Sequence, residues 1–152
     1  MKNDTTVERT SEREVVITRT FNAPAHLVFE AWTKPELMRR WWVPKSMGMT
    51  LLSCEMDVRI GGTYRFVFAF EPEPMAFFGR YLEVSPPSRL VWTNEESGDA
   101  GQISTVTLED RGDTTRLVLH ELYPSAEALD AATGSYDGMP ESFDQLDELL
   151  AG

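Results

Sequence analysis

The chain has 152 residues, 41% of them apolar, and its 25 acidic against 14 basic side chains give a formal net charge of -11. This length corresponds to one ordinary domain that can bury most of the surface its unfolded form exposes. The negative charge repels phosphate backbones and anionic lipid surfaces, so we expect neither nucleic acid nor a membrane as a partner.

The beginning of the chain predicts a flexible leader followed by one strand and two short helices. Residues 1–13 are polar and aperiodic, which is typical of a leader that the domain over 14–152 does not need. Residues 14–21 are rich in β-branched side chains and predict a strand. Apolar residues at helical spacing follow Pro24, and a second short helix is predicted from Pro35 to about Trp42. Two such helices need a sheet to pack on.

Extended segments fill the middle of the chain, from Met49 to Glu121. They are separated by turn signals at close intervals, which predicts an antiparallel meander of six or seven strands once the first strand is included. The turns are expected at Gly61-Gly62 and over 71–74, 85–88, 97–99 and 110–113.

The end of the chain predicts a short helix over 125–132 and a longer amphipathic helix over 137–150, capped by Asp137. Its apolar stripe must be covered, and the sheet is the available cover. A curved sheet wrapped on one helix tends to enclose a roomy apolar space, which is a common ligand site.

Four runs of sequence and the terminal helix together resemble one family, the activator of heat-shock protein 90 ATPase homologues, within the START-like superfamily. The runs lie over 21–32, 41–45, 57–65 and 79–91, and the terminal match lies over 138–147. The resemblance implies a helix-grip α+β fold, with a long C-terminal helix over a curved sheet and a cavity between them. It does not imply one activity. The chain departs from the family's usual pattern at Val43 and in the short 71–74 turn, both near the expected cavity mouth.

A two-residue hairpin at Gly61-Gly62 would place Arg59 opposite Tyr64 and Asp57 opposite Phe66. Both charges would then share a sheet face with the aromatic residues Tyr64, Phe66, Phe68 and Phe70. If that face looks inward, the two charges form a buried pair that can orient the polar end of a ligand. A structural ion pair, or Arg59 stacked on Tyr64, is the alternative. A bulge at Gly61 would instead turn Met56 and Val58 inward and leave the charges in solvent.

Other chemistry has weak support in the sequence. His26 and His120 lie in no metal-spacing motif, no glycine-rich phosphate loop is present, and the single cysteine, Cys54, excludes an intramolecular disulfide. We therefore expect no cofactor and no metal. A lone cysteine and the absence of a secretory signal over the first residues of the chain fit a cytoplasmic protein.

The leading hypothesis is the binding of a small, largely apolar molecule in the internal cavity. One tryptophan of the 41–42 pair is expected in the core and Trp42 nearer the ligand. The candidate ligand-binding residues are Trp42, Asp57, Arg59, Tyr64, Phe66, Phe68, Trp92, Met139, Phe143 and Leu146. A cyclase- or hydrolase-type enzyme using Asp57, Arg59, Tyr64 or His120 is one alternative. A module that modulates a chaperone, or contacts a second copy or another protein through its acidic surface, is the other.

Overall fold

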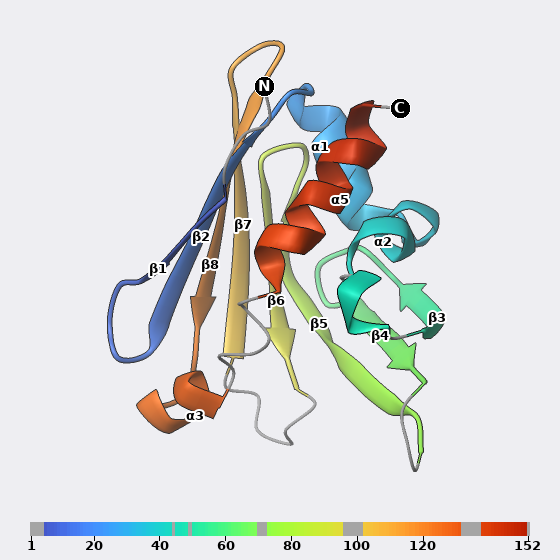
Figure 1. Cartoon of the computed structure of the whole chain (residues 1–152), viewed down its shortest axis with the longest axis vertical. Coiled ribbons are helices and arrows are strands. Elements are labelled where there is room, and N and C mark those ends of the chain that lie inside the picture. Colours follow the sequence, from blue (N-terminus) through green and yellow to red (C-terminus); the bar gives the residue numbers. More distant parts are fainter. Residues whose placement is uncertain are drawn as a thin grey trace.

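A computed structural model describes residues 5–43, 45–48, 50–69, 73–95, 102–131 and 138–151 (Figure 1). Strands and helices follow one another largely as the sequence predicts. In chain order they are β1 (Thr6–Arg9), β2 (Glu14–Phe21), α1 (Ala25–Thr33), α2 (Pro35–Trp41), the 3-10 turn η1 (Lys45–Met47), β3 (Leu51–Met56), β4 (Thr63–Phe68), β5 (Met75–Ser85), β6 (Arg89–Asn94), β7 (Gln102–Asp110), β8 (Thr115–Leu122), α3 (Ala126–Ala131) and α5 (Met139–Ala151).

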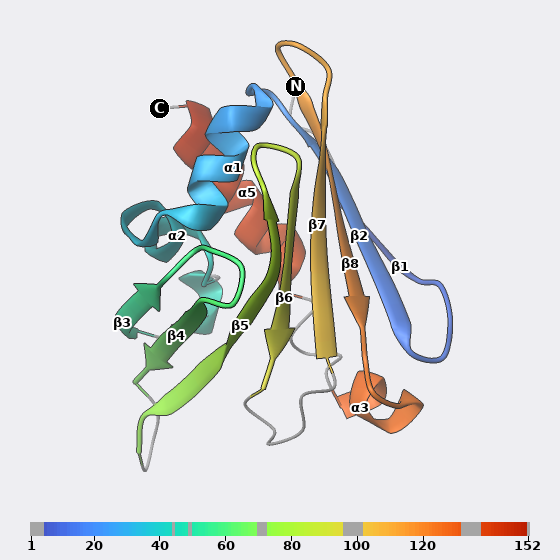
Figure 2. The same ribbon diagram turned by 180° about the vertical axis from the view of Figure 1, so that it is seen from behind.

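The strands form one sheet in the order β1-β2-β8-β7-β6-β5-β4-β3, and every pair is antiparallel. Helices α1, α2 and α5 contact one another and lie over one face of the sheet, which we call the inner face (Figures 1 and 2). Helix α3 lies at the opposite end of the sheet from the C-terminus. This arrangement confirms the predicted helix-grip fold.

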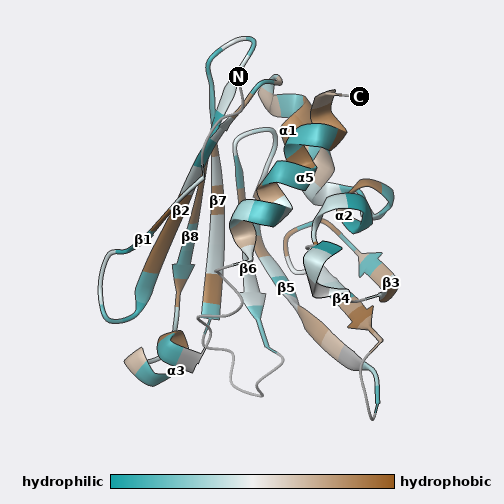
Figure 3. Cartoon of the chain, in the orientation of Figure 1, coloured by the Kyte–Doolittle hydropathy of each residue, from teal (hydrophilic) through white to brown (hydrophobic). Residues whose placement is uncertain are grey.

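Alternation of apolar and polar residues decides which side of each strand is buried. In β2, Val15, Ile17 and Phe21 are fully buried and Arg19, on the same face, is 2% exposed, whereas the residues that alternate with them are only partly covered. In β8, Leu117 and Leu119 alternate in the same way. Helix α5 shows apolar and polar bands along its length (Figure 3), and its apolar stripe covers the sheet as expected. The core therefore lies between the inner face and the helices.

The leader requires a correction, because Thr6–Arg9 forms β1 and pairs with β2. Val7 lies opposite Ile17, and the Thr10 amide donates to the Glu14 carbonyl at 3.0 Å to close the hairpin. All four side chains of β1 are exposed. The backbone ladder, and not side-chain burial, holds this strand, so hydropathy gave no signal for it. It is also the strand beyond the predicted six or seven.

The predicted two-residue hairpin at Gly61-Gly62 is wrong. Strand β3 ends at Met56, which pairs with Tyr64, and residues 57–62 form a longer connection. The Gly61 amide donates to the Tyr81 carbonyl at 2.8 Å, and the Tyr81 amide donates to the Gly62 carbonyl at 2.9 Å. The two glycines therefore pair with β5 instead of turning β3 into β4. Gly61 has φ of +83°, and a Cβ at Gly62 would lie 2.0 Å from the Asp57 carbonyl oxygen.

The shifted register reverses the face on which the charged pair lies. Met56 and Val58 now pack against the core, as the bulge alternative predicted, and Asp57 and Arg59 point to solvent. The predicted turn at 97–99, the helix cap at Asp137 and the inward position of Phe70 lie outside the described residues, and the predicted turn over 71–74 lies partly outside them. No helix in the described ranges is long and apolar enough to cross a membrane.

Candidate functional site

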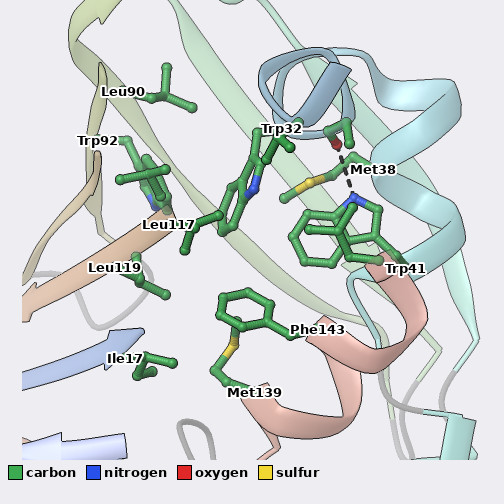
Figure 4. Close-up of a cluster of buried hydrophobic side chains, with 14 of the residues drawn as sticks. Ile17, Trp32, Met38, Trp41, Leu90, Trp92, Leu117, Leu119, Met139 and Phe143 are labelled. Atoms are coloured by element: carbon green, nitrogen blue, oxygen red, sulfur yellow. Dashed lines mark hydrogen bonds between the residues drawn. The ribbon is translucent and has the colours of Figure 1, made fainter. Parts of the chain in front are cut away.

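An aromatic cluster fills the space between α1, α2 and α5 (Figure 4). Trp32 and Trp41 are buried, with ring centroids 4.8 Å apart in an edge-to-face contact, and the Trp41 indole N–H donates to the Ala31 carbonyl at 3.0 Å. Phe143 of α5 is fully buried against both rings, at 6.3 Å from each. Such contacts add specific geometry to apolar burial. This end of the interior is therefore packed core.

Trp41 is the core member of the 41–42 pair, and Trp42 is less buried. Trp41 is fully buried, whereas Trp42 is partly buried, with its ring 5.5 Å from Trp41 and 6.4 Å from Phe66 on the sheet. Its backbone carbonyl accepts from the Ser142 hydroxyl at 2.8 Å, and the Gln145 amide donates to the carbonyls of Trp41 and Val43. These bonds fix the end of α2 against α5.

The remaining predicted aromatic and apolar residues do meet on the inner side. Tyr64, Phe66 and Phe68 alternate along β4 with exposed or partly exposed neighbours and are each at most 5% exposed. The other buried members are Trp92, Met139, Phe143 and Leu146. Figure 4 shows Trp92, from β6, beside Trp32, and their ring centroids are 5.7 Å apart.

Asp57 and Arg59 do not belong to this interior, which corrects the predicted polar anchor. Their side chains are 53% and 76% exposed and form an ion pair with each other at 2.9 Å. His120, considered as a catalytic residue, faces the outer side of β8 and contacts the Glu14 carboxylate at 2.7 Å. Its hydrogen bond to Glu14 lowers the pKa of that carboxyl group. Of the acid–base candidates from the sequence, only Tyr64 is inside.

A connected set of polar side chains takes the place of the predicted anchor. The Tyr64 hydroxyl lies 2.7 Å from the Thr93 carbonyl and 3.1 Å from the Asn94 amide oxygen. The Asn94 amide donates to the Ser104 hydroxyl at 2.8 Å, and that hydroxyl donates to the Glu121 carboxylate at 2.6 Å. We call Tyr64, Asn94, Ser104 and Glu121 the polar row. It crosses the inner face from β4 to β8.

Glu121 is the most unusual member of the polar row, because it is a carboxylate only 9% exposed. It accepts from Ser104 and, at 2.8 Å, from the Gln102 amide. A carboxyl group this deeply buried is held by hydrogen bonds or it destabilises the fold. The sequence contained its signal, since Glu121 follows Leu117 and Leu119 at two-residue spacing and so shares their face. The neighbouring His120 was considered as the candidate catalytic residue of this strand, and Glu121 was not.

A second polar atom of the interior is the indole N–H of Trp32. Its nitrogen is buried and has no hydrogen-bond acceptor in the described part of the chain. Trp92 connects the two features, because its ring lies beside Trp32 and its backbone pairs with Ser104. The interior thus offers an unused donor and a hydrogen-bonded acceptor group on either side of one tryptophan.

Metal and nucleophile chemistry find little support among the described residues. They contain no group of three or more His, Cys, Asp or Glu placed to hold a metal ion. Burial raises the pKa of the Cys54 thiol to about 11, so the thiolate is scarce at neutral pH. Cys54 packs against the core as a small apolar residue.

The architecture defines the class of the protein as a START-like, helix-grip domain. The chain belongs to the family of activator of Hsp90 ATPase homolog 1-like proteins, whose model matches residues 22–151. No curated protein matches it.

Solved structures agree over the whole domain. A Rhodobacter sphaeroides protein is 24% identical with a TM-score of 0.84, covering 97% of this chain and 98% of its own. A Nitrosomonas europaea protein is 25% identical with a TM-score of 0.81, covering 94% and 97%. A Chromobacterium violaceum protein is 27% identical with a TM-score of 0.76, covering 93% and 99%. These similarities support the fold and assign no ligand.

Proposed function

We propose that the protein binds a small, largely apolar molecule with one hydroxyl-like polar group between the inner face and α5. The observation that carries the proposal is the polar row, a hydrogen-bonded chain ending in buried Glu121, on a face otherwise made of aromatic and aliphatic side chains. Small-molecule sites typically combine apolar walls with a few placed polar groups. The aromatic walls would hold the body of the molecule, and the polar row would orient its polar end.

The choice of a hydroxyl follows from the chemistry of the two polar features. The Trp32 indole can only donate a hydrogen bond, whereas the carboxyl oxygens of Glu121 and the amide oxygen of Asn94 can accept one. A hydroxyl both donates and accepts, so it can serve either feature. A ligand without such a group would bury these polar atoms with no gain in hydrogen bonding.

A matched pair of probes, 2-naphthol and naphthalene, tests this proposal. They share one ring system and differ only in the hydroxyl group. We expect quenching of tryptophan fluorescence to show saturable binding of both, with 2-naphthol bound at least about tenfold more tightly, the value of one hydrogen bond to a charged group. Glu121→Gln should reduce this preference.

Glu109→Gln is the matched control, because Glu109 undergoes the same chemical change at an exposed site on β7. It should leave the preference for 2-naphthol unchanged. Equal affinity for the two probes, or a preference that Glu121→Gln leaves intact, would remove the polar row from the proposal.

A further inference from the structure

A concave site lies on the face of β4 and β5 that is opposite the aromatic residues of the inner face. It is an open groove of about 430 Å³, and we call it the outer groove. Thr63, Arg65, Phe78 and Arg80 line it with their outward-pointing side chains, which alternate with the inward-pointing Tyr64 and Phe66. The volume is within the range of small-molecule sites.

The outer groove contains an exposed aromatic ring, that of Phe78, which is not part of the packed core. Phe78 is 41% exposed, whereas its neighbour Phe77 turns inward and packs against Phe68 at 5.3 Å. Leu82, on the same face of β5, is 44% exposed, and Ile60, in the connection that pairs with Tyr81, is 71% exposed. Apolar side chains gathered on one surface in this way are typical of a contact site.

The guanidinium groups beside Phe78 are in two different states. Arg80 is fixed by two hydrogen bonds to the Glu95 carboxylate, at 3.1 and 3.3 Å, and the hydrogen bond from Arg80 holds the pKa of Glu95 below its usual range. Arg65 lies directly opposite Phe78 in the β4–β5 ladder and makes no hydrogen bond or ion pair in the described ranges. Its other cross-strand neighbour is Glu55 of β3.

An arginine that has no partner among the described residues and lies next to an exposed ring is unusual on a chain with net charge -11, since acidic side chains are abundant enough to pair with it. Arginine presents a planar fork of donors that matches a carboxylate with two parallel hydrogen bonds. An aromatic face nearby accepts a second ring in an offset or edge contact. The two features together match a molecule that is planar and apolar at one end and a carboxylate at the other.

We propose that the outer groove binds a small aromatic carboxylate, with its carboxylate on Arg65 and its ring against Phe78. The Arg80–Glu95 pair is locally neutral, so Arg65 supplies the charge that selects the anion. Glu55, the cross-strand neighbour of Arg65 on β3, would repel a bound carboxylate and so weaken its binding. This site is separate from the interior site, because the sheet lies between them.

The probe is 2-naphthoate, followed by isothermal titration and by amide chemical-shift changes in the isotope-labelled protein. We expect saturable binding centred on Arg65 and Phe78 that weakens as salt is added. Arg65→Gln should weaken binding at least about tenfold, the loss of a charge-assisted bidentate contact. Phe78→Ala should weaken it about threefold or more, since an aromatic pair contributes about 1 kcal/mol. Glu55→Gln should strengthen it.

Arg40→Gln is the matched control, because Arg40 is an exposed arginine on α2, outside the outer groove. It should bind 2-naphthoate as the unchanged protein does. The proposal is overturned if no saturable binding occurs up to about 10 mM, or if binding survives both Arg65→Gln and Phe78→Ala. It is also overturned if Glu121→Gln, and not Arg65→Gln, removes the binding. Loss of 2-naphthol binding in the interior would leave this result untouched.

Discussion

The Asp57–Arg59 pair shows how a change of strand register alters the energy expected of a charged residue, since Met56 and not Arg59 lies opposite Tyr64. Both side chains are more than half exposed, so water screens their attraction and solvates either one when the other is removed. We predict that Asp57→Ala and Arg59→Ala each change the free energy of unfolding by at most about 1 kcal/mol in urea titrations. Single changes that cost about 3 kcal/mol or more, with partial recovery in the double variant, would show that the pair is buried and would contradict its exposed position.

Arg19 is the opposite case, a charge that the fold encloses completely. It is 2% exposed on the inner face of β2, and its guanidinium contacts Asp144 at 2.6 Å and Asp147 at 3.1 Å on α5. It also bonds the Thr5 hydroxyl at 3.0 Å and lies over the Phe21 ring. The contact ties the middle of α5 to the sheet.

We predict that Arg19→Ala lowers the free energy of unfolding by about 3 kcal/mol, because it leaves an unfilled space and removes a buried partner. Arg9→Ala is the matched control, since Arg9 pairs with Asp130 in solvent at 43% and 65% exposure and should cost at most about 1 kcal/mol. Chemical denaturation of both variants measures the difference. Equal losses would mean that burial does not set the strength of the Arg19 contacts.

At the scale of elements, β1 gives the edge of the sheet an extra strand held by its backbone. We predict that removing residues 1–9 lowers the free energy of unfolding by roughly 1 to 3 kcal/mol, since a few backbone hydrogen bonds and the Thr5 contact are lost. Thermal unfolding monitored by circular dichroism measures the change. An unaltered midpoint would show that the fold does not need β1, as the sequence suggested.

The elements also show what a sequence predicts well and where it fails. β-Branched composition predicted β2, alternation placed the aromatic residues of β4 on one face, and helical spacing predicted the apolar stripe of α5, because each pattern is local and repeats over several residues. Gly61-Gly62 was misread, since a glycine pair permits both a tight hairpin and a longer loop, and the contact that decides between them is with Tyr81 on β5. A local sequence pattern cannot reveal a contact with a residue about 20 positions further along the chain.

The candidate site also has one part that the sequence predicts and one part that it does not. The apolar walls, from Phe66 to Phe143, were predictable because burial follows from alternation and helical spacing. The polar row was not, because its hydrogen bonds join β4, β6, β7 and β8, whose neighbours are set by the sheet order. The two-residue alternation along β8 is enough to place Glu121 on the inner face. Its hydrogen bond from Ser104 can be known only from the structure, because Ser104 lies on β7.

At the scale of the whole molecule, the sheet separates two surfaces of different chemistry. The inner face has aromatic walls, the polar row and a cover of three helices, and the outer face of β4 and β5 has Arg65 beside the exposed ring of Phe78. An apolar alcohol and an aromatic carboxylate should therefore bind on opposite sides of one sheet. Because 2-naphthol and 2-naphthoate share a ring system, a difference in where they bind reports the effect of the polar group alone.

The most direct test of the interior site is the set of intermolecular nuclear Overhauser effects between bound 2-naphthol and the labelled protein. We predict contacts from the naphthol ring protons to the Met139 methyl group and to the side chains of Leu119 and Trp92, all of which face the interior. Contacts confined to Phe78 and Leu82 on the outer face, with none to Met139 or Trp92, would contradict the proposed binding site.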